Sequence, residues 1–104
     1  MQQTPFDLII VIPVYNEDGC IEEVVTSWHI FLKDYFQKEQ FRILVVNDGS
    51  KDNTPAILDK LAGTISDLEV IHQKNGGHGN AVLNGYRKAI AYKPEWIFQT
   101  DSDN

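Results

Sequence analysis

Leu8-Ile9-Ile10-Val11-Ile12, followed directly by Pro13-Val14-Tyr15-Asn16-Glu17, is the stretch that decides the fold. Five consecutive apolar residues without polar alternation are typical of a strand that is covered on both faces. Three further short apolar runs follow along the chain, at Ile43–Val46, Leu68–Ile71 and Trp96–Phe98. The chain therefore has four candidate strands, and most of them resemble the buried strands of a parallel sheet.

The segments between these runs carry apolar residues at the three- and four-residue spacing of amphipathic helices. The first predicted helix covers residues 21–36, with Asp18 as its N-cap. The second has Thr54 as its predicted N-cap and Pro55 at the first helical position. The third runs from about Gly79 to Tyr92. Helical segments thus alternate regularly with the strands.

The predicted order is β-α-β-α-β-α-β, in which right-handed crossovers produce a parallel sheet with helices on both faces. The fold class is therefore α/β, a three-layer α/β/α arrangement with a mainly parallel, Rossmann-like sheet. By length, residues 1–104 form one small domain. In such sheets ligands bind outside the carboxyl ends of the strands, where the strand order reverses.

Polar residues gather after the carboxyl end of every predicted strand. The four segments are Pro13–Asp18, Asn47–Ser50, Asn75–Asn80 and Asp101–Asn104. The amino ends carry only Asp7, Arg42, Asp67 and Glu95, which are ordinary solvated turn residues. This one-sided distribution favours a ligand-binding crevice at the carboxyl edge of the sheet.

The net charge of -6 excludes the class of proteins that read a nucleic-acid backbone, because the nine Lys and Arg residues are scattered along the chain. A small anionic ligand would need backbone N–H groups or a divalent cation to offset the carboxylates. The first residues lack the features of a signal peptide and no apolar run is long enough to span a membrane, which predicts a cytoplasmic protein. Cys20 is expected to have a packing role.

Asp101 and Asp103 are two residues apart, so both carboxylates can reach one ion such as Mg²⁺ or Mn²⁺. Chance alone supplies roughly 0.8 Asp-x-Asp triplets in a chain with this Asp content, so a solvated turn is the alternative. The position of the triplet, directly after a predicted strand at the crevice edge, favours a metal or ligand site.

Three other candidates have structural alternatives. Asp48 lies in a sequence that favours a turn, but an acid at the end of the second strand can also bond a nucleotide's sugar or base. Tyr15 is either a surface aromatic or a ring that stacks on a base. Glu17 can stabilise a helix N-terminus and also face a ligand.

The glycines at 76, 77 and 79 lack the dinucleotide-binding fingerprint, and they form either a flexible loop or a phosphate-binding nest. His78 is expected to be a polar loop residue.

Four motifs occur in order along the chain: IPVYNED at 12–18, VVNDGSKDNT at 45–54, NGGHGNAVLNGYRKA at 75–89 and TDSD at 100–103. With these motifs the chain resembles the nucleotide-binding half of the inverting family-two glycosyltransferases, which have the GT-A fold. Within the family, the motifs are most similar to the branch that loads sugars onto polyprenyl phosphates, such as dolichol-phosphate mannose synthases.

The resemblance implies a role for each matching residue. It implies that Pro13, Tyr15 and Glu17 line a nucleoside pocket, that Val46 offers backbone contacts and that Asp48 bonds the base. It further implies that Asp101 and Ser102 contact the ribose or diphosphate, and that Asp103 with Asp101 holds the divalent cation, Mn²⁺ or Mg²⁺. The implied donor is a nucleotide-diphosphate sugar, and the implied acceptor is a polyprenyl phosphate or a saccharide.

In the family the acceptor pocket and the general base follow the position of Asp103. Residues 1–104 are therefore expected to form a single truncated nucleotide-sugar-binding domain that is inactive alone. The resemblance is also compatible with a full-length protein that associates with a membrane. An unpaired sheet edge is expected to favour self-association.

Two alternatives remain in other function classes. The first is a non-catalytic nucleotide-binding or assembly module of the same fold. The second is a phosphoacceptor switch domain, which requires an acid pair after the first strand and an acceptor Asp after the third. Here those places hold Asn16-Glu17-Asp18 and Asn75-Gly76-Gly77, which disfavours the switch domain.

Overall fold

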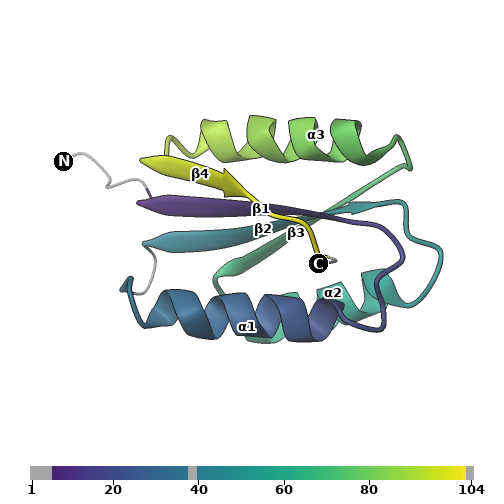
Figure 1. Ribbon diagram of the computed structural model, residues 1–104, viewed down its shortest axis with the longest axis horizontal. Helices are drawn as coiled ribbons and strands as arrows, with labels where there is room; N and C mark the ends of the chain where they lie inside the picture. The colour runs from purple at the N-terminus through teal and green to yellow at the C-terminus, as the bar shows by residue number, and fades with distance from the viewer. Residues whose placement is uncertain (1–5, 38–39, 103–104) are drawn as a thin grey trace.

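The computed structural model describes residues 6–37 and 40–102. Four strands alternate with three helices, as the sequence predicts (Figure 1). Their bounds are β1 (Leu8–Val14), α1 (Ile21–Lys33), β2 (Phe41–Asp48), α2 (Thr54–Thr64), β3 (Leu68–Gln73), α3 (His78–Ala91) and β4 (Trp96–Gln99).

The four strands form one parallel sheet with the order β3-β2-β1-β4. Helices α1 and α2 lie on one face of the sheet and α3 lies on the other (Figure 1). Because β4 returns to the far side of β1, its right-handed crossover through α3 must pass over the opposite face from α1 and α2. This confirms the three-layer α/β/α prediction and makes the strand order reverse between β1 and β4.

The core divides according to the two-residue repeat of the strands. Leu8, Ile10 and Ile12 of β1 belong to the cluster under α1 and α2, whereas Ile9 and Val11 belong to the cluster under α3. Every residue of β1 is buried, because each face of this strand has a helical layer above it. Coverage on both faces explains why β1 is an unbroken apolar run in the sequence.

The helix ends differ from the prediction where loops contact each other. Cys20 is the N-cap residue of α1 and its side chain makes no capping bond, so the predicted N-cap Asp18 is wrong. The carboxylate of Asp18 instead accepts a bond from the backbone N–H of Asn53, 3.2 Å away. Helix α1 also ends at Lys33, before the predicted end at Phe36.

The starts of the other two helices each move by one residue. Thr54 is the first residue of α2, with Asn53 as the N-cap, so the predicted N-cap role of Thr54 is wrong. Its hydroxyl accepts a bond from the backbone N–H of Glu17 instead. Helix α3 begins at His78, one residue before the predicted start at Gly79.

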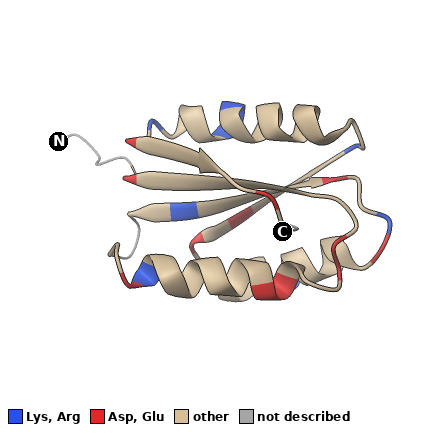
Figure 2. Ribbon diagram, in the orientation of Figure 1, with Lys and Arg blue, Asp and Glu red and all other residues tan. Residues whose placement is uncertain are grey.

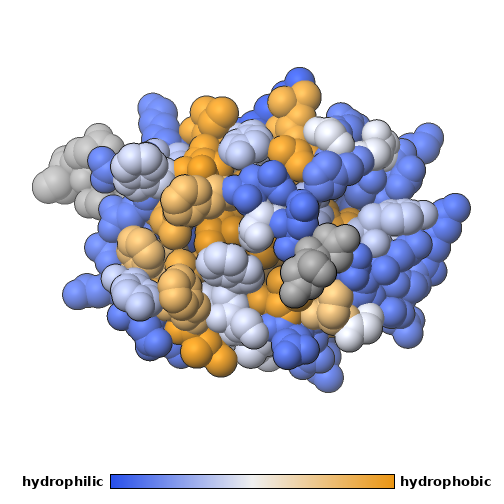
Figure 3. All heavy atoms as spheres, viewed as in Figure 1, coloured by the Kyte–Doolittle hydropathy of each residue, from blue (hydrophilic) through white to orange (hydrophobic). Residues whose placement is uncertain are grey.

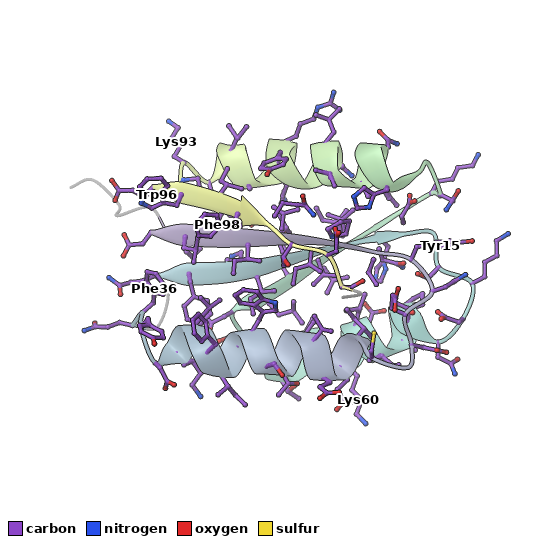
Figure 4. The ribbon with its side chains drawn as sticks, viewed as in Figure 1. Tyr15, Phe36, Lys60, Lys93, Trp96 and Phe98 are labelled. Carbon is purple, nitrogen blue, oxygen red and sulfur yellow. The ribbon has the colours of Figure 1, made fainter. Side chains whose placement is uncertain are left out.

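One side of the sheet is less covered than the sequence suggests. Trp96 and Phe98 of β4 are 64% and 58% exposed. They are in register with Leu8 and Ile10 of β1 and so point to the α1 face, where apolar side chains gather on the surface (Figures 3 and 4). Within the described part of the chain, β4 pairs only with β1. The expected unpaired edge is therefore present, whereas self-association stays a prediction.

None of the helices in the described part of the chain is long and apolar enough to cross a membrane.

Candidate functional site

A cavity of about 390 Å³ lies at the carboxyl edge of the sheet, next to the point where the strand order reverses. Segments that follow all four strands contribute to its wall, as the sequence predicts. The lining residues are Pro13, Val14, Tyr15, Glu17, Asp48, Asn75, Gly77, His78, Ala81, Asp101 and Ser102. Cavities of this volume are large enough for a small-molecule ligand.

The segment after β1 supplies one side of the cavity. Pro13 and Val14 at the end of β1, together with Tyr15 and Glu17 directly after it, line this side. The ring of Tyr15 is 44% exposed, at the outer part of this wall (Figure 4). A half-exposed ring at the mouth of a polar cavity is available to stack on a flat ligand.

The carboxylate of Asp48, at the end of β2, is buried and binds the loop between β3 and α3. Its Oδ1 accepts bonds from Gln73 Nε2 and from the backbone N–H of Gly76, both at 2.8 Å. Its Oδ2 accepts the N–H of Gly77 at 2.9 Å, with Asn75 Nδ2 at 3.4 Å. The glycine N–H groups that could have bound a phosphate thus hold Asp48 itself.

These bonds determine the ionisation of Asp48. Burial opposes the charged form, but the donors from Gln73, Gly76 and Gly77 and the nearby His78 outweigh burial and hold the pKa of Asp48 below its ordinary value of 3.8. A carboxylate has about four lone-pair positions, and four donors already point at this one. A bond from Asp48 to a ligand would require one of these donors to move away.

The segment after β4 supplies another part of the wall. Asp101 is about half exposed, and its Oδ1 accepts a bond from Gln99 Nε2 at 2.9 Å. Ser102 is buried beside it. Nε2 of His78 lies 3.8 Å from Oδ1 of Asp101. Asp103, the predicted chief metal ligand, lies outside the described residues.

His78 is a cavity residue that sequence reasoning did not select. It is the first residue of α3 and 65% exposed, so the N-terminus of this helix opens on the cavity beside Asp101. The available signal was its position, directly after a glycine pair that separates a strand from a helix. Helix N-termini favour anions because their backbone N–H groups are unpaired and the helix dipole is positive there.

Val46 is the one described candidate that does not line the cavity. It is fully buried in the middle of the sheet, between Pro13 of β1 and Ile71 of β3.

The charge of the cavity wall is one-sided. Its described lining includes the carboxylates of Glu17, Asp48 and Asp101 and has no Lys or Arg. Figure 2 shows where the acidic and basic residues lie along the ribbon. An anionic ligand would therefore depend on the α3 N-terminus, on His78 and on a bound cation.

The donor set fits a cation that is shared with a ligand. No group of three or more His, Cys, Asp or Glu side chains within residues 6–37 and 40–102 could hold a metal ion by itself. Mg²⁺ is usually bound by one or two carboxylates together with substrate phosphates, and carboxylate oxygens also suit Mn²⁺. The half-exposed Asp101 carboxylate provides such a partial site.

The comparison with known families agrees with this arrangement. The model of the family described as Glycosyl transferase family 2 matches residues 9–104, which is nearly the whole chain. The chain belongs to glycosyl transferase family 2. Among relatives, it is 31% identical over 98 residues to the uncharacterized glycosyltransferase MG060 of Mycoplasma genitalium, covering 93% of this chain and 32% of the relative.

Another family member extends the resemblance to the polyprenyl-phosphate branch. The chain is 28% identical to the UDP-N-acetylglucosamine–dolichyl-phosphate N-acetylglucosaminyltransferase of Methanococcus voltae, covering 92% of this chain and 41% of the relative. The chain thus spans about a third of the length of these two relatives.

Solved structures show that this family 2 chain has the GT-A fold. TarS residues 1–349 of S. aureus, in complex with UDP, superpose with a TM-score of 0.77 at 27% identity, covering 94% of this chain and 28% of that TarS chain. The mannosyltransferase PcManGT of Pyrobaculum calidifontis, in complex with GDP-Man and Mn²⁺, superposes with a TM-score of 0.68 at 26% identity. This match covers 82% of the present chain and 26% of the PcManGT chain.

Proposed function

We propose that the cavity binds the nucleotide and diphosphate of a nucleotide-diphosphate sugar, and that a protein containing this chain transfers the sugar with inversion in a metal-dependent reaction. The convergence of four strand-end segments on one cavity, with an aromatic ring on one wall and Asp101 on the other, carries this proposal. The similar structures of TarS with UDP and PcManGT with GDP-Man and Mn²⁺ support it.

The nucleoside is proposed to occupy the wall that follows β1. Tyr15 would stack on the base, with Pro13 and Glu17 beside it. Asp48 would shape this wall through the loop that it holds, and it would accept a bond from the base only when a loop donor moves aside. Val46 would contribute only through its backbone, because its side chain is buried.

The diphosphate is proposed to lie between Asp101 and the N-terminus of α3. Asp101 and Asp103 would hold Mn²⁺ or Mg²⁺, and Ser102 would contact the diphosphate or ribose. The cation would act as a Lewis acid toward the departing diphosphate, whose charge grows as the glycosyl bond breaks. His78 and the first N–H groups of α3 would donate hydrogen bonds to the same charge.

For inversion, an acceptor oxygen attacks the anomeric carbon from the side opposite the diphosphate. A hydroxyl of a saccharide would need a general base, whereas a polyprenyl phosphate is already ionised. The name of the Methanococcus voltae relative favours the second acceptor. Residues 1–104 alone are proposed to bind the donor without transferring the sugar, and turnover by this chain above a metal-free control would contradict that.

Calorimetric titration with UDP-, GDP- and dTDP-sugars, with and without Mn²⁺, tests the proposal. One donor class is expected to bind, and its affinity should fall when Mn²⁺ is removed or when Asp101 or Asp103 is changed to Ala. Asp34→Ala is the matched control, because it removes the same charge just after α1, outside the cavity lining. Binding that ignores Mn²⁺ and both substitutions would contradict the metal role, and binding of none of the three donors would contradict the proposed function.

A further inference from the structure

The β1–α1 loop is held by side chains of the β2–α2 loop through three consecutive backbone N–H groups. The N–H of Asn16 donates to Ser50 Oγ at 2.8 Å, and the N–H of Glu17 donates to Thr54 Oγ1 at 3.0 Å. The N–H of Asp18 donates to Asp52 Oδ2 at 3.2 Å. Each donor has a partner 34 to 37 residues away in the sequence, so the contact is tertiary.

Two side chains of the β1–α1 loop return the contact. Asn16 Oδ1 accepts the backbone N–H of Lys51 at 2.8 Å, and Asp18 Oδ2 accepts that of Asn53 at 3.2 Å. Five hydrogen bonds therefore join two loops that side-chain packing alone would hold loosely. We call Asn16, Asp18, Ser50, Asp52 and Thr54 the loop brace.

Asp52 also holds its own loop, so a single carboxylate links both loops. Its Oδ1 accepts the N–H of Thr54 at 2.9 Å while its Oδ2 holds Asp18. Desolvation opposes the charge on Asp52, but the hydroxyl and N–H of Thr54 and the N–H of Asp18 outweigh it and keep the pKa of Asp52 below its ordinary value. The carboxylate is thus ionised, and so a strong acceptor, at neutral pH.

Residues 15–18 of the β1–α1 loop alternate between two roles. Tyr15 and Glu17 line the cavity, whereas the side chains of Asn16 and Asp18 bind the neighbouring loop. Asn16 has a φ of 54°, in the left-handed region that Asn tolerates better than most residues. This turn orients Tyr15 and Glu17 to one side and the loop brace to the other.

We propose that the loop brace residues are positioning residues for nucleoside binding: they fix the backbone that carries Tyr15 and Glu17 before the ligand arrives. This inference rests on the proposed function and extends it to side chains that do not line the cavity. Without the loop brace, the β1–α1 loop would have to be ordered on binding, and the lost preorganisation would weaken affinity.

Thr54 offers the sharpest test, because it is fully buried and its hydroxyl can be removed without changing its shape. Thr54→Val removes both the acceptor for the N–H of Glu17 and the hydroxyl that bonds Asp52, and Thr54→Ser keeps both. Thr64→Val is the matched control, since the hydroxyl of Thr64 donates only to Leu61 O within α2. Ser50→Ala, which removes the acceptor for the N–H of Asn16, is a second variant in case Thr54→Val fails to fold.

Two measurements are made on each variant: the Kd of UDP, GDP and dTDP by calorimetry, and hydrogen exchange of the backbone N–H groups of Asn16, Glu17 and Asp18 without ligand. Thr54→Val and Ser50→Ala should exchange faster there and bind about tenfold more weakly, as expected for loss of a hydrogen bond that orders the loop. Thr54→Ser and Thr64→Val should match the wild type in both.

The two measurements separate the possible failures. Unchanged exchange in Thr54→Val and Ser50→Ala would show that the loop brace does not hold this loop. Faster exchange with wild-type affinity would overturn the positioning role. If the wild-type protein binds none of UDP, GDP and dTDP, the proposed function fails and the positioning role fails with it, while the exchange data still report on the loop brace.

Discussion

Replacing Gly85 with alanine tests the contact that places α3 against the sheet. A Cβ atom at position 85 would lie 2.4 Å from Cγ1 of Val11 and 3.1 Å from Cγ2 of Val46. Both valines are fully buried in central strands, and their β-branched side chains have little freedom to rotate. The helix must therefore move away from β1 and β2 to accept the methyl group.

The size of the effect follows from the distances. Ordinary carbon–carbon contact begins near 3.5 Å, so the helix has to retreat by about 1.1 Å at this point. Overpacking of this severity costs about 3 kcal/mol, whereas alanine in a helix gains about 1 kcal/mol over glycine. The free energy of unfolding should fall by about 2 kcal/mol, which corresponds to a Tm roughly 8 to 16 °C lower for a domain of this size.

Urea unfolding followed by circular dichroism measures this change, with Gly63→Ala as the matched control. Gly63 also lies in a helix, but nothing lies within 4 Å of the place that a methyl group at position 63 would occupy. The control should therefore be as stable as the wild type or more stable, by up to about 1 kcal/mol. If Gly85→Ala were as stable as Gly63→Ala, the close packing of α3 on Val11 and Val46 would be refuted.

Three further predictions concern the site and the sheet edge. The lowered pKa of Asp48 means that its charge stabilises the fold above pH 3.8 and that this contribution is lost as the pH falls through the lower, folded-state pKa. Below pH 4 the urea midpoint should therefore fall more steeply for the wild type than for Asp48→Asn, and parallel profiles would contradict this. Tyr15→Ala should weaken nucleotide binding about tenfold with little loss of stability, whereas Tyr15→Phe should keep the affinity, because stacking needs only the ring. Calorimetry measures both affinities, and an equal loss of affinity in the two variants would argue against stacking. The exposed rings of Trp96 and Phe98 predict self-association that increases with concentration and that Phe98→Ser reduces, and a single monomer at every concentration in sedimentation velocity would contradict it.

The strands and their alternation with helices along the chain were predictable because their physical cause is visible in the sequence. β1 and β2 are buried on both faces, so they appear as continuous apolar runs, and the polar segments that follow them mark the carboxyl edge. The family motifs added the roles of Tyr15, Glu17 and Asp101, which the structure brings to one cavity. The exposure of β4 could not be predicted, because a short aromatic run has the same sequence pattern whether or not a helix covers the strand.

The helix caps could not be predicted, because tertiary contacts outweigh local preference. Asp18 and Thr54 are good N-cap residues by type, and each occurs just before or at the start of a helix. Their oxygens accept bonds from the neighbouring loop instead, from partners more than 30 residues away. Local sequence contains no information on which of two competing donors will be nearer.

Most acidic residues at the carboxyl edge of the sheet serve the fold and are not open to a ligand, which the sequence alone does not indicate. Asp18, Asp48 and Asp52 are all occupied by backbone N–H groups of this chain, so they act as structural acceptors. The carboxylate most open to a ligand is that of Asp101, which has one side-chain donor and stands half exposed opposite His78. A count of acids therefore overstates the repulsion that a diphosphate would meet. The carboxylates that a bound diphosphate would still meet are mainly those of Asp101 and Glu17, and a divalent cation at Asp101, shared with the diphosphate, would offset much of their charge.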